Sequence, residues 1–306
     1  MAMFLHILTD IILPILVLAL VGFVAQKLLH FDIRTLIRLN LYLFVPAVLF
    51  VKVYRAEVSL AFVGIVFGVV TAVVLAMWGL GEGVSRLLGI PRGRRKAFTN
   101  SLTFFNSGNF GIPLSELVFA ANPLAATVQI FIMLIQNVTG NTFGAFQASS
   151  GNSGGRQAMK NVLKLPALYV LAVVAVVKAA GLTMPPIVLM PLDFLSSGFI
   201  AMALVTLGAQ LAEIRFDFHV RDILLSCLIR LAVAPALCYG IVAALGLHGI
   251  LAQSLILGVS TPTAVNTAIL AREYENEHEY ASQIVLVSTL LSVVSISVVI
   301  YLTSGL

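Results

Sequence analysis

Two nine-residue stretches decide the fold of this chain, because each interrupts an otherwise apolar segment. The first runs from Asn106 to Leu114 and reads NSGNFGIPL, and the second runs from Gly258 to Asn266 and reads GVSTPTAVN. Pro113 and Pro262 each lack a backbone donor and crowd the preceding turn, and the neighbouring glycines weaken a helix further. Each stretch therefore predicts a helix that breaks near its middle and starts again at the proline.

The chain around these breaks has the composition of a membrane protein. Of its 306 residues, 60% are hydrophobic and 10% are charged, whereas roughly a quarter of the residues in soluble domains are charged. Apolar segments of about 20 residues recur along nearly the whole chain and lack the two-residue alternation of an outer-membrane barrel. The sequence predicts an all-α polytopic membrane protein and excludes a water-soluble globule.

Ten apolar segments are candidates for transmembrane spans. They cover residues 4–28, 33–54, 60–88, 97–121, 124–149, 162–181, 186–212, 223–247, 249–271 and 280–303. A cleavable signal would begin with basic residues, but the first basic residue is Lys27, so we expect the first segment to remain as a span. The only two cysteines, Cys227 and Cys238, lie too far apart on one expected helix to form a disulfide.

Two landmarks recur about 150 positions apart. Pro14 lies in the run ILPILVLA and Pro166 in the run KLPALYVLA, while Ser101 and Ser254 each precede a leucine ahead of one of the two breaks. We therefore expect two five-span halves, residues 1–149 and 162–306, joined by a cytoplasmic linker at 150–161. An odd number of spans inverts the second half relative to the first, an arrangement typical of secondary transporters.

The basic residues predict the orientation. Fourteen of the 18 lysines and arginines fall in loops on one side of the ten spans and three on the other, while Arg230 lies inside a span. By the positive-inside rule the richer side is cytoplasmic, so we expect both termini outside a cell membrane of bacterial inner-membrane type. The basic residues form no single stripe of the kind that binds nucleic acid, so the expected partners include no nucleic acid. The expected surroundings are membrane lipids.

The two breaks predict a site for an anion. If the halves are inverted, the helices that follow Pro113 and Pro262 start near the midplane and leave in opposite directions, so their N-terminal ends converge. Free N–H groups and helix dipoles favour an anion there, and Asn109 and Asn266 add amide donors. The preceding half-helices end at the same place, where their carbonyls are suited to a protonated group or Na⁺.

These motifs carry a family resemblance. The run NxGNFGIPL at residues 106–114, the run PTAVN at residues 262–266 and ten spans in two halves resemble the auxin efflux carrier family, which includes bacterial malonate-type transporters. The resemblance implies crossing broken helices four and nine, a scaffold of helices 1, 2, 6 and 7, and a transport core of helices 3–5 and 8–10. It also implies an elevator-type motion and a homodimer that carries small organic anions, malonate-like or auxin-like. The chain lacks the long central loop of the plant carriers.

The residues expected to bind the substrate come from both breaks and from the fifth span. They are Asn106, Asn109, Gly111, Pro113, Asn137, Asn141, Thr261, Pro262, Thr263 and Asn266. Asn137 and Asn141 share one helical face, where they either line the site or hydrogen-bond to a neighbouring helix.

Four further polar residues are candidates for coupling or gating, namely Glu116, Gln136, Asp193 and Arg230. Glu116 would lie in the first turn after the break, where an acid either favours the helix dipole or couples transport by protonation. Asp193 and Arg230 lie at depths that permit an ion pair, and an unpaired charge at such a depth is costly. Pairing, snorkelling or a wet cavity would offset this cost, and we favour a structural or gating pair over direct contact with the substrate.

The sequence contains no motif for metal binding, nucleophilic catalysis or phosphate binding. The five histidines show no metal-ligand spacing, and no nucleophile constellation or phosphate loop is present. We expect no enzyme, no metal and no cofactor, with H⁺ or Na⁺ open as the coupling ion. Two alternatives stay open: a Na⁺-coupled symporter of the bile-acid type with a related fold, and a membrane sensor of carboxylates or lipids.

Overall fold

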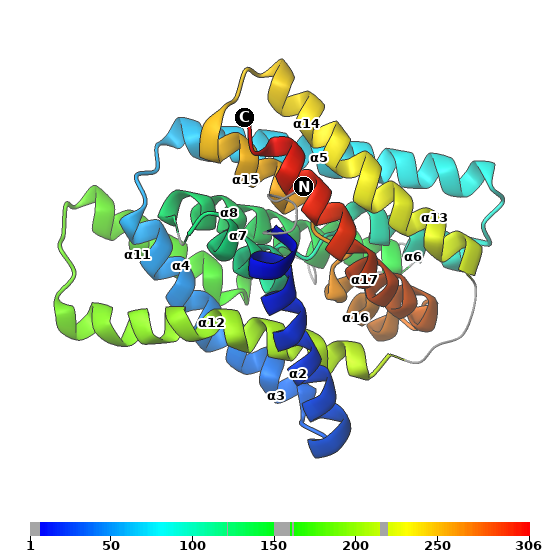
Figure 1. The fold of residues 1–306 in the computed structure, drawn as a ribbon, viewed down its shortest axis with the longest axis horizontal. Helices are drawn as coiled ribbons and strands as arrows, with labels where there is room; N and C mark the ends of the chain where they lie inside the picture. The colour runs from blue at the N-terminus through cyan, green and yellow to red at the C-terminus, as the bar shows by residue number, and fades with distance from the viewer. Residues whose placement is uncertain (1–6, 121, 150–159, 161, 215–219) are drawn as a thin grey trace.

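The computed structural model describes residues 7–120, 122–149, 160, 162–214 and 220–306, and there it is helical apart from connections and one isolated β-bridge (Figure 1). Within those ranges, seven helices are long and apolar enough to cross a membrane: Ile7–Leu29, Ile33–Arg55, Leu60–Leu87, Pro123–Ala148, Pro186–Ala212, Arg221–Ala244 and His278–Thr303. Two shorter apolar helices are Pro166–Ala179 and Gly249–Val259. The all-α class is confirmed, while the count of ten spans stays a prediction.

The elements follow one another as α-helices joined or widened by short π-helical turns. In chain order they are η1 (Ile7–Ile12), α2 (Leu13–Leu29), α3 (Ile33–Leu39), η2 (Asn40–Phe44), α4 (Val45–Arg55), α5 (Leu60–Leu87), α6 (Arg92–Thr103), η3 (Ser107–Gly111), α7 (Ile112–Val118), α8 (Pro123–Thr139), η4 (Gly140–Gly144), α9 (Ala145–Ala148), α11 (Pro166–Ala179), α12 (Pro186–Ala212), α13 (Val220–Leu228), η5 (Ile229–Val233), α14 (Ala234–Ala244), α15 (Gly249–Val259), α16 (Val265–Glu273) and α17 (His278–Thr303).

Four of the π-helical turns end two residues before a proline. Pro14, Pro46, Pro113 and Pro235 stand in this position after η1, η2, η3 and η5. A proline has no N–H to donate and crowds the carbonyl four residues earlier, and the wider turn accommodates both defects. These helices therefore continue through their prolines.

This accommodation corrects the predicted position of the first break. The residues between the two helices are 104–106, and the next helix begins at Ser107, six residues before Pro113. The second break covers residues 260–264, and α16 begins at Val265, after Pro262 rather than at it. Both stretches interrupt a helix as predicted, but neither proline is the first residue of the new helix.

The two breaks lie against each other. Phe105 and Thr263 form an antiparallel β-bridge. The N–H of Asn106 donates to the carbonyl of Pro262 at 2.8 Å, and the N–H of Ala264 donates to the carbonyl of Phe104 at 3.0 Å. Segments more than 150 residues apart in the sequence therefore satisfy each other's backbone where their helices cannot. We call this paired region, residues 104–106 and 260–264, the crossover.

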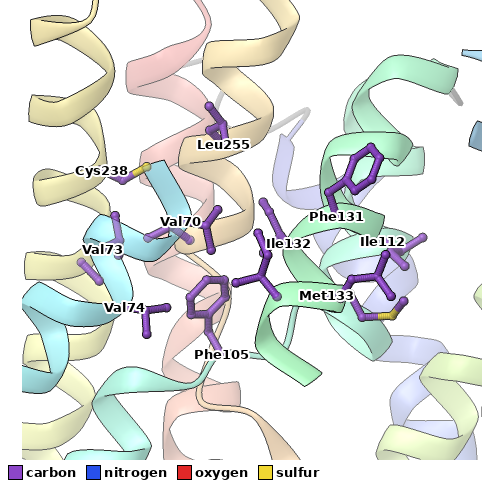
Figure 2. Close-up of a cluster of buried hydrophobic side chains, with 14 of the residues drawn as sticks. Val70, Val73, Val74, Phe105, Ile112, Phe131, Ile132, Met133, Cys238 and Leu255 are labelled. Carbon is purple, nitrogen blue, oxygen red and sulfur yellow. The ribbon is translucent and has the colours of Figure 1, made fainter. Parts of the chain in front are cut away.

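The crossover is embedded in the main apolar core. Figure 2 shows Phe105 from the first break among Val70 and Val74 of α5 and Ile132 of α8, with Leu255 of α15 nearby. All five side chains are buried. Burying aromatic and branched side chains at this point holds the irregular backbone of the crossover in one arrangement.

A second contact brings two helix backbones together. A Cβ atom on Gly208 of α12 would lie 1.8 Å from the carbonyl oxygen of Ala19 in α2, and one on Gly22 would lie 2.1 Å from that of Val205. Neither position has room for any side chain. Small residues of this kind let two membrane helices approach closely, so α2 and α12 form a tightly packed pair.

Two further expectations concern covalent structure and domains. Cys227 and Cys238 are buried and free, which confirms that they form no disulfide. Of the predicted linker at 150–161, only Lys160 lies within the described residues. The division into halves at 1–149 and 162–306 therefore stays a prediction.

Candidate functional site

A cavity of about 330 Å³ lies beside the crossover. Its walls come from α3, η2 and the start of α4, from the first break and η3, from α8 and η4, from Leu165, from α12, and from residues 264–273. The lining is rich in uncharged polar side chains, and its polar members are Asn40, Asn106, Ser107, Asn109, Gln136, Asn137, Asn141, Thr206, Asn266, Thr267 and Glu273.

Half of the predicted substrate residues meet at this cavity. Asn106, Asn109, Asn137, Asn141 and Asn266 line it, and so does Gln136, which the sequence suggested for coupling. The other five are buried in or beside the crossover and are not among the lining residues: Gly111, Pro113, Thr261, Pro262 and Thr263. The structure thus separates the motif residues into amides at the cavity and small or cyclic residues that shape the backbone.

Two buried donors at the cavity have no hydrogen-bond partner among the described residues. They are Nδ2 of Asn106 and Nε2 of Gln136, whose side chains are 6% and 7% exposed. The other end of the Gln136 amide accepts from the N–H of Phe105 at 3.1 Å, which orients its NH₂ group. A buried donor left unpaired costs about 1–3 kcal/mol. A ligand oxygen in the cavity would remove that cost.

Asn40 belongs to the site although the sequence analysis did not select it. Its Nδ2 donates to Oδ1 of Asn109 at 3.1 Å, and the residue is buried at the start of η2. This bond orients Asn109 and leaves the NH₂ group of Asn109 for another acceptor. The available signal was a single asparagine in the apolar run 33–54, ahead of Pro46.

Two helix starts add backbone donors. Ser107, Gly108 and Asn109 of η3 line the cavity, as do Val265 and Asn266 of α16. The first N–H groups of a helix lack intrahelical partners and carry partial positive charge. No Lys, Arg or His stands among the described lining residues, and Glu273 is the single charged one. Amides and helix N-termini are therefore the groups that would hold an anion.

Glu116 lies away from the cavity and is paired. Nζ of Lys52 in α4 lies 2.7 Å from Oε1 and 2.8 Å from Oε2 of Glu116 in α7, and both side chains are mostly buried. The predicted place in a first helical turn is wrong, because the helix starts at Ser107 and Glu116 follows two turns later. Its carboxylate instead ties α7 to α4.

The predicted pair of Asp193 and Arg230 is wrong. Asp193 is paired with Arg55, whose Nη2 lies 2.8 Å from Oδ2 of Asp193. Arg230 is fully buried, and its guanidinium donates to the carbonyls of Leu102 at 3.1 Å, of Thr261 at 3.3 Å, and of Val259. The prediction used depth along the membrane normal only, which says nothing about lateral separation.

Comparison with known proteins identifies the family. A model described as membrane transport protein matches residues 7–300 of the chain. The chain belongs to the auxin efflux carrier family. This carrier is 25% identical to an uncharacterized transporter of Methanothermobacter thermautotrophicus, in a match that covers 94% of this chain and 96% of that protein. It is 27% identical to a Rhizobium meliloti protein named as a putative malonate transporter, with 96% and 95% covered.

Family membership sets the class of activity. The carrier is a membrane transport protein with several apolar helices, and its relatives are named as transporters. Within the described part of the chain, no group of three His, Cys, Asp or Glu side chains is placed to hold a metal ion.

Proposed function

We propose that this carrier is a secondary active transporter of small organic anions and that it binds a carboxylate in the cavity beside the crossover. The observation that carries this proposal is a pair of buried donors that have no hydrogen-bond partner among the described residues, Nδ2 of Asn106 and Nε2 of Gln136. Carboxylate oxygens accept hydrogen bonds from amides and from helix N-termini. The Rhizobium meliloti relative, named for malonate, supports a carboxylate of that size.

The proposed architecture is ten spans in two inverted halves with helices four and nine crossing. The crossover of residues 104–106 and 260–264 supports it, because two interrupted helices pair there through their backbones. The glycine contact joins α2, in the proposed first span, to α12, in the proposed seventh span. It therefore supports a rigid scaffold of helices 1, 2, 6 and 7. We also propose that two such scaffolds form a homodimer in the cell membrane.

The proposed mechanism is an elevator-type movement of the core, helices 3–5 and 8–10, against this scaffold. Two side-chain contacts would change during the movement, because each joins the proposed scaffold to the proposed core. Asn40 and Lys52 lie in the second proposed span, which belongs to the scaffold, and their partners Asn109 and Glu116 lie in the fourth, which belongs to the core. Two residues that line the cavity adjoin loops predicted to be cytoplasmic: Leu165 follows one such loop, and Glu273 precedes another. The cavity therefore lies toward the predicted cytoplasmic side. In the proposed orientation this conformation faces inward, and the Lys52–Glu116 pair closes the outer side.

Thermal unfolding of the purified carrier against a panel of carboxylates tests the proposed function. Malonate, acetate and indole-3-acetate are suitable probes, with their uncharged amides as matched controls. A ligand that binds only the folded state raises its melting temperature. We expect at least one carboxylate to stabilise the carrier and its amide to do so less, followed by uptake of that anion into proteoliposomes. Stabilisation by lipids alone would instead favour a membrane sensor.

A cross-link tests the elevator movement. In a background without Cys227 and Cys238, Lys52→Cys and Glu116→Cys would be joined by a short bifunctional thiol reagent. We expect joined carrier to lose transport by about tenfold or more and to keep its malonate affinity within about twofold, because the cavity is accessible in this conformation. Each single cysteine treated alike is the control. Unchanged transport after complete cross-linking would contradict the movement.

Labelling tests the orientation. Asn122→Cys should react from outside and Ser153→Cys from the cytoplasm in the same background, and the reverse pattern would contradict the proposed topology. Asn122 precedes α8, and Ser153 lies outside the described residues.

A further inference from the structure

Arg230 closes the face of the crossover where two helices end. α6 ends at Thr103 and α15 at Val259, and the guanidinium donates to carbonyls at both ends, those of Leu102 and Val259, and to Thr261 in the second break. The ring of Phe105 covers it, with its centroid 4.6 Å from Cζ of Arg230. None of the side chain is exposed.

The charges at this place balance without a carboxylate. The C-terminal end of a helix carries roughly half a negative charge and carbonyls that lack intrahelical partners. Two such ends therefore offset one guanidinium, which presents five N–H donors in a fixed plane. Among the ion pairs of the described residues, none includes Arg230. A buried cation inside a membrane protein requires such compensation, and here the backbone supplies it.

Converging carbonyl oxygens are also the ligands that bind Na⁺ and K⁺ in membrane proteins. We propose that the guanidinium of Arg230 occupies the carbonyl site of the crossover that would otherwise take Na⁺. Anion binding by this carrier then requires no Na⁺. Replacing Arg230 with a small neutral residue then exposes the carbonyls of Leu102, Val259 and Thr261 as a monovalent-cation site. The part about anion binding rests on the proposed function, whereas the cation site does not.

The cation site is tested on the purified, substrate-free carrier by thermal unfolding in NaCl and in choline chloride of equal concentration. We expect the parent to melt at the same temperature in both salts. Arg230→Ala should melt lower in choline and recover by about 3 °C or more in Na⁺, with saturation as Na⁺ is raised. Arg230→Lys keeps a cation and should show no Na⁺-specific rise. Arg55→Ala, in the exposed pair with Asp193, is the matched arginine control.

In the unfolding experiment, the proposal would be overturned by a Na⁺-specific rise in the parent or in Arg230→Lys, or by a folded Arg230→Ala protein that is equally stable in both salts. If Arg230→Ala does not fold, the parent and Arg230→Lys decide, because an open Na⁺ site in either would appear as a rise in NaCl.

Malonate affinity measured in the same two salts separates this inference from the proposed function. We expect the parent to bind malonate with affinities that agree within about twofold. Binding only in NaCl would overturn the inference and leave the proposed function standing. Binding of no carboxylate in either salt would overturn the proposed function, while the melting temperatures would still decide the cation site.

Discussion

The two faces of the crossover differ in whether their polar groups are satisfied. On the face where α6 and α15 end, three carbonyls receive the guanidinium of Arg230. On the face where η3 and α16 begin, the buried amides of Asn106 and Gln136 keep donors with no partner among the described residues. The same pair of breaks therefore creates one completed network, which stabilises the fold, and one incomplete network, which a ligand can complete.

Removing the cation of the completed face should have the largest effect. We expect Arg230→Leu to lower the free energy of unfolding by about 3–5 kcal/mol, because three buried carbonyls lose their donor and the two helix ends lose their counter-charge. Chemical denaturation in detergent micelles measures this value.

Arg55→Leu provides the comparison for that prediction. Its side chain is 47% exposed in the pair with Asp193, and an exposed pair contributes about 0–1 kcal/mol. Equal losses for the two leucine variants would remove the distinction between the buried cation of the crossover and an ordinary surface arginine.

An isosteric change on the open face should weaken binding without disturbing the fold. Gln136→Glu keeps an oxygen to accept from the N–H of Phe105 but replaces the free NH₂ group with a carboxylate oxygen. We expect malonate affinity to fall about 10-fold to 100-fold, or roughly 1.5–3 kcal/mol. Gln253→Glu is the matched control, since Gln253 donates to Thr303 at the far end of α17. A loss of affinity in both variants would indicate a general charge effect.

A hydrogen bond that supports the crossover from outside the cavity should matter least. Oγ of Ser288 in α17 accepts from the N–H of Thr263 at 3.2 Å. We expect Ser288→Ala to lower the free energy of unfolding by about 1 kcal/mol and to leave malonate affinity within about twofold. Ser304→Ala, at an exposed position, should change neither. A tenfold loss of affinity in Ser288→Ala would mean that the crossover backbone itself tunes the site.

The sequence predicted where the two helices are interrupted and which amide side chains lie near the interruptions. It predicted less well which groups the polar side chains contact. Prolines and glycines act on the local backbone, so the two broken helices could be inferred from neighbouring residues alone. The start of the second helix was misplaced at Pro113, because the π turn η3 lets that helix pass through its proline. Whether such a turn forms depends on packing around it, which the local sequence does not contain.

The long-range partners of polar side chains could not be predicted from the sequence, for a related reason. Asp193 and Arg230 were expected to pair on depth alone, yet each found a nearer partner on another helix. Asn40 was missed because one asparagine in an apolar span has no motif around it, and its role appears only when η2 meets Asn109. Partner choice for a buried polar group depends on which helices become neighbours, and tertiary packing decides that.

Binding of malonate to Asn106→Ala, measured by calorimetry beside thermal unfolding, tests the central claim most directly. Nδ2 of Asn106 is a buried donor without a partner among the described residues, so its removal should leave the unliganded carrier as stable as the parent or more stable. Malonate affinity should nevertheless fall about 10-fold to 100-fold, as it should in Asn266→Ala. Asn276→Ala, whose Nδ2 donates to the carbonyl of Ala148 away from the cavity, should bind within about twofold of the parent. A stable Asn106→Ala carrier that binds malonate as tightly as the parent would contradict the account.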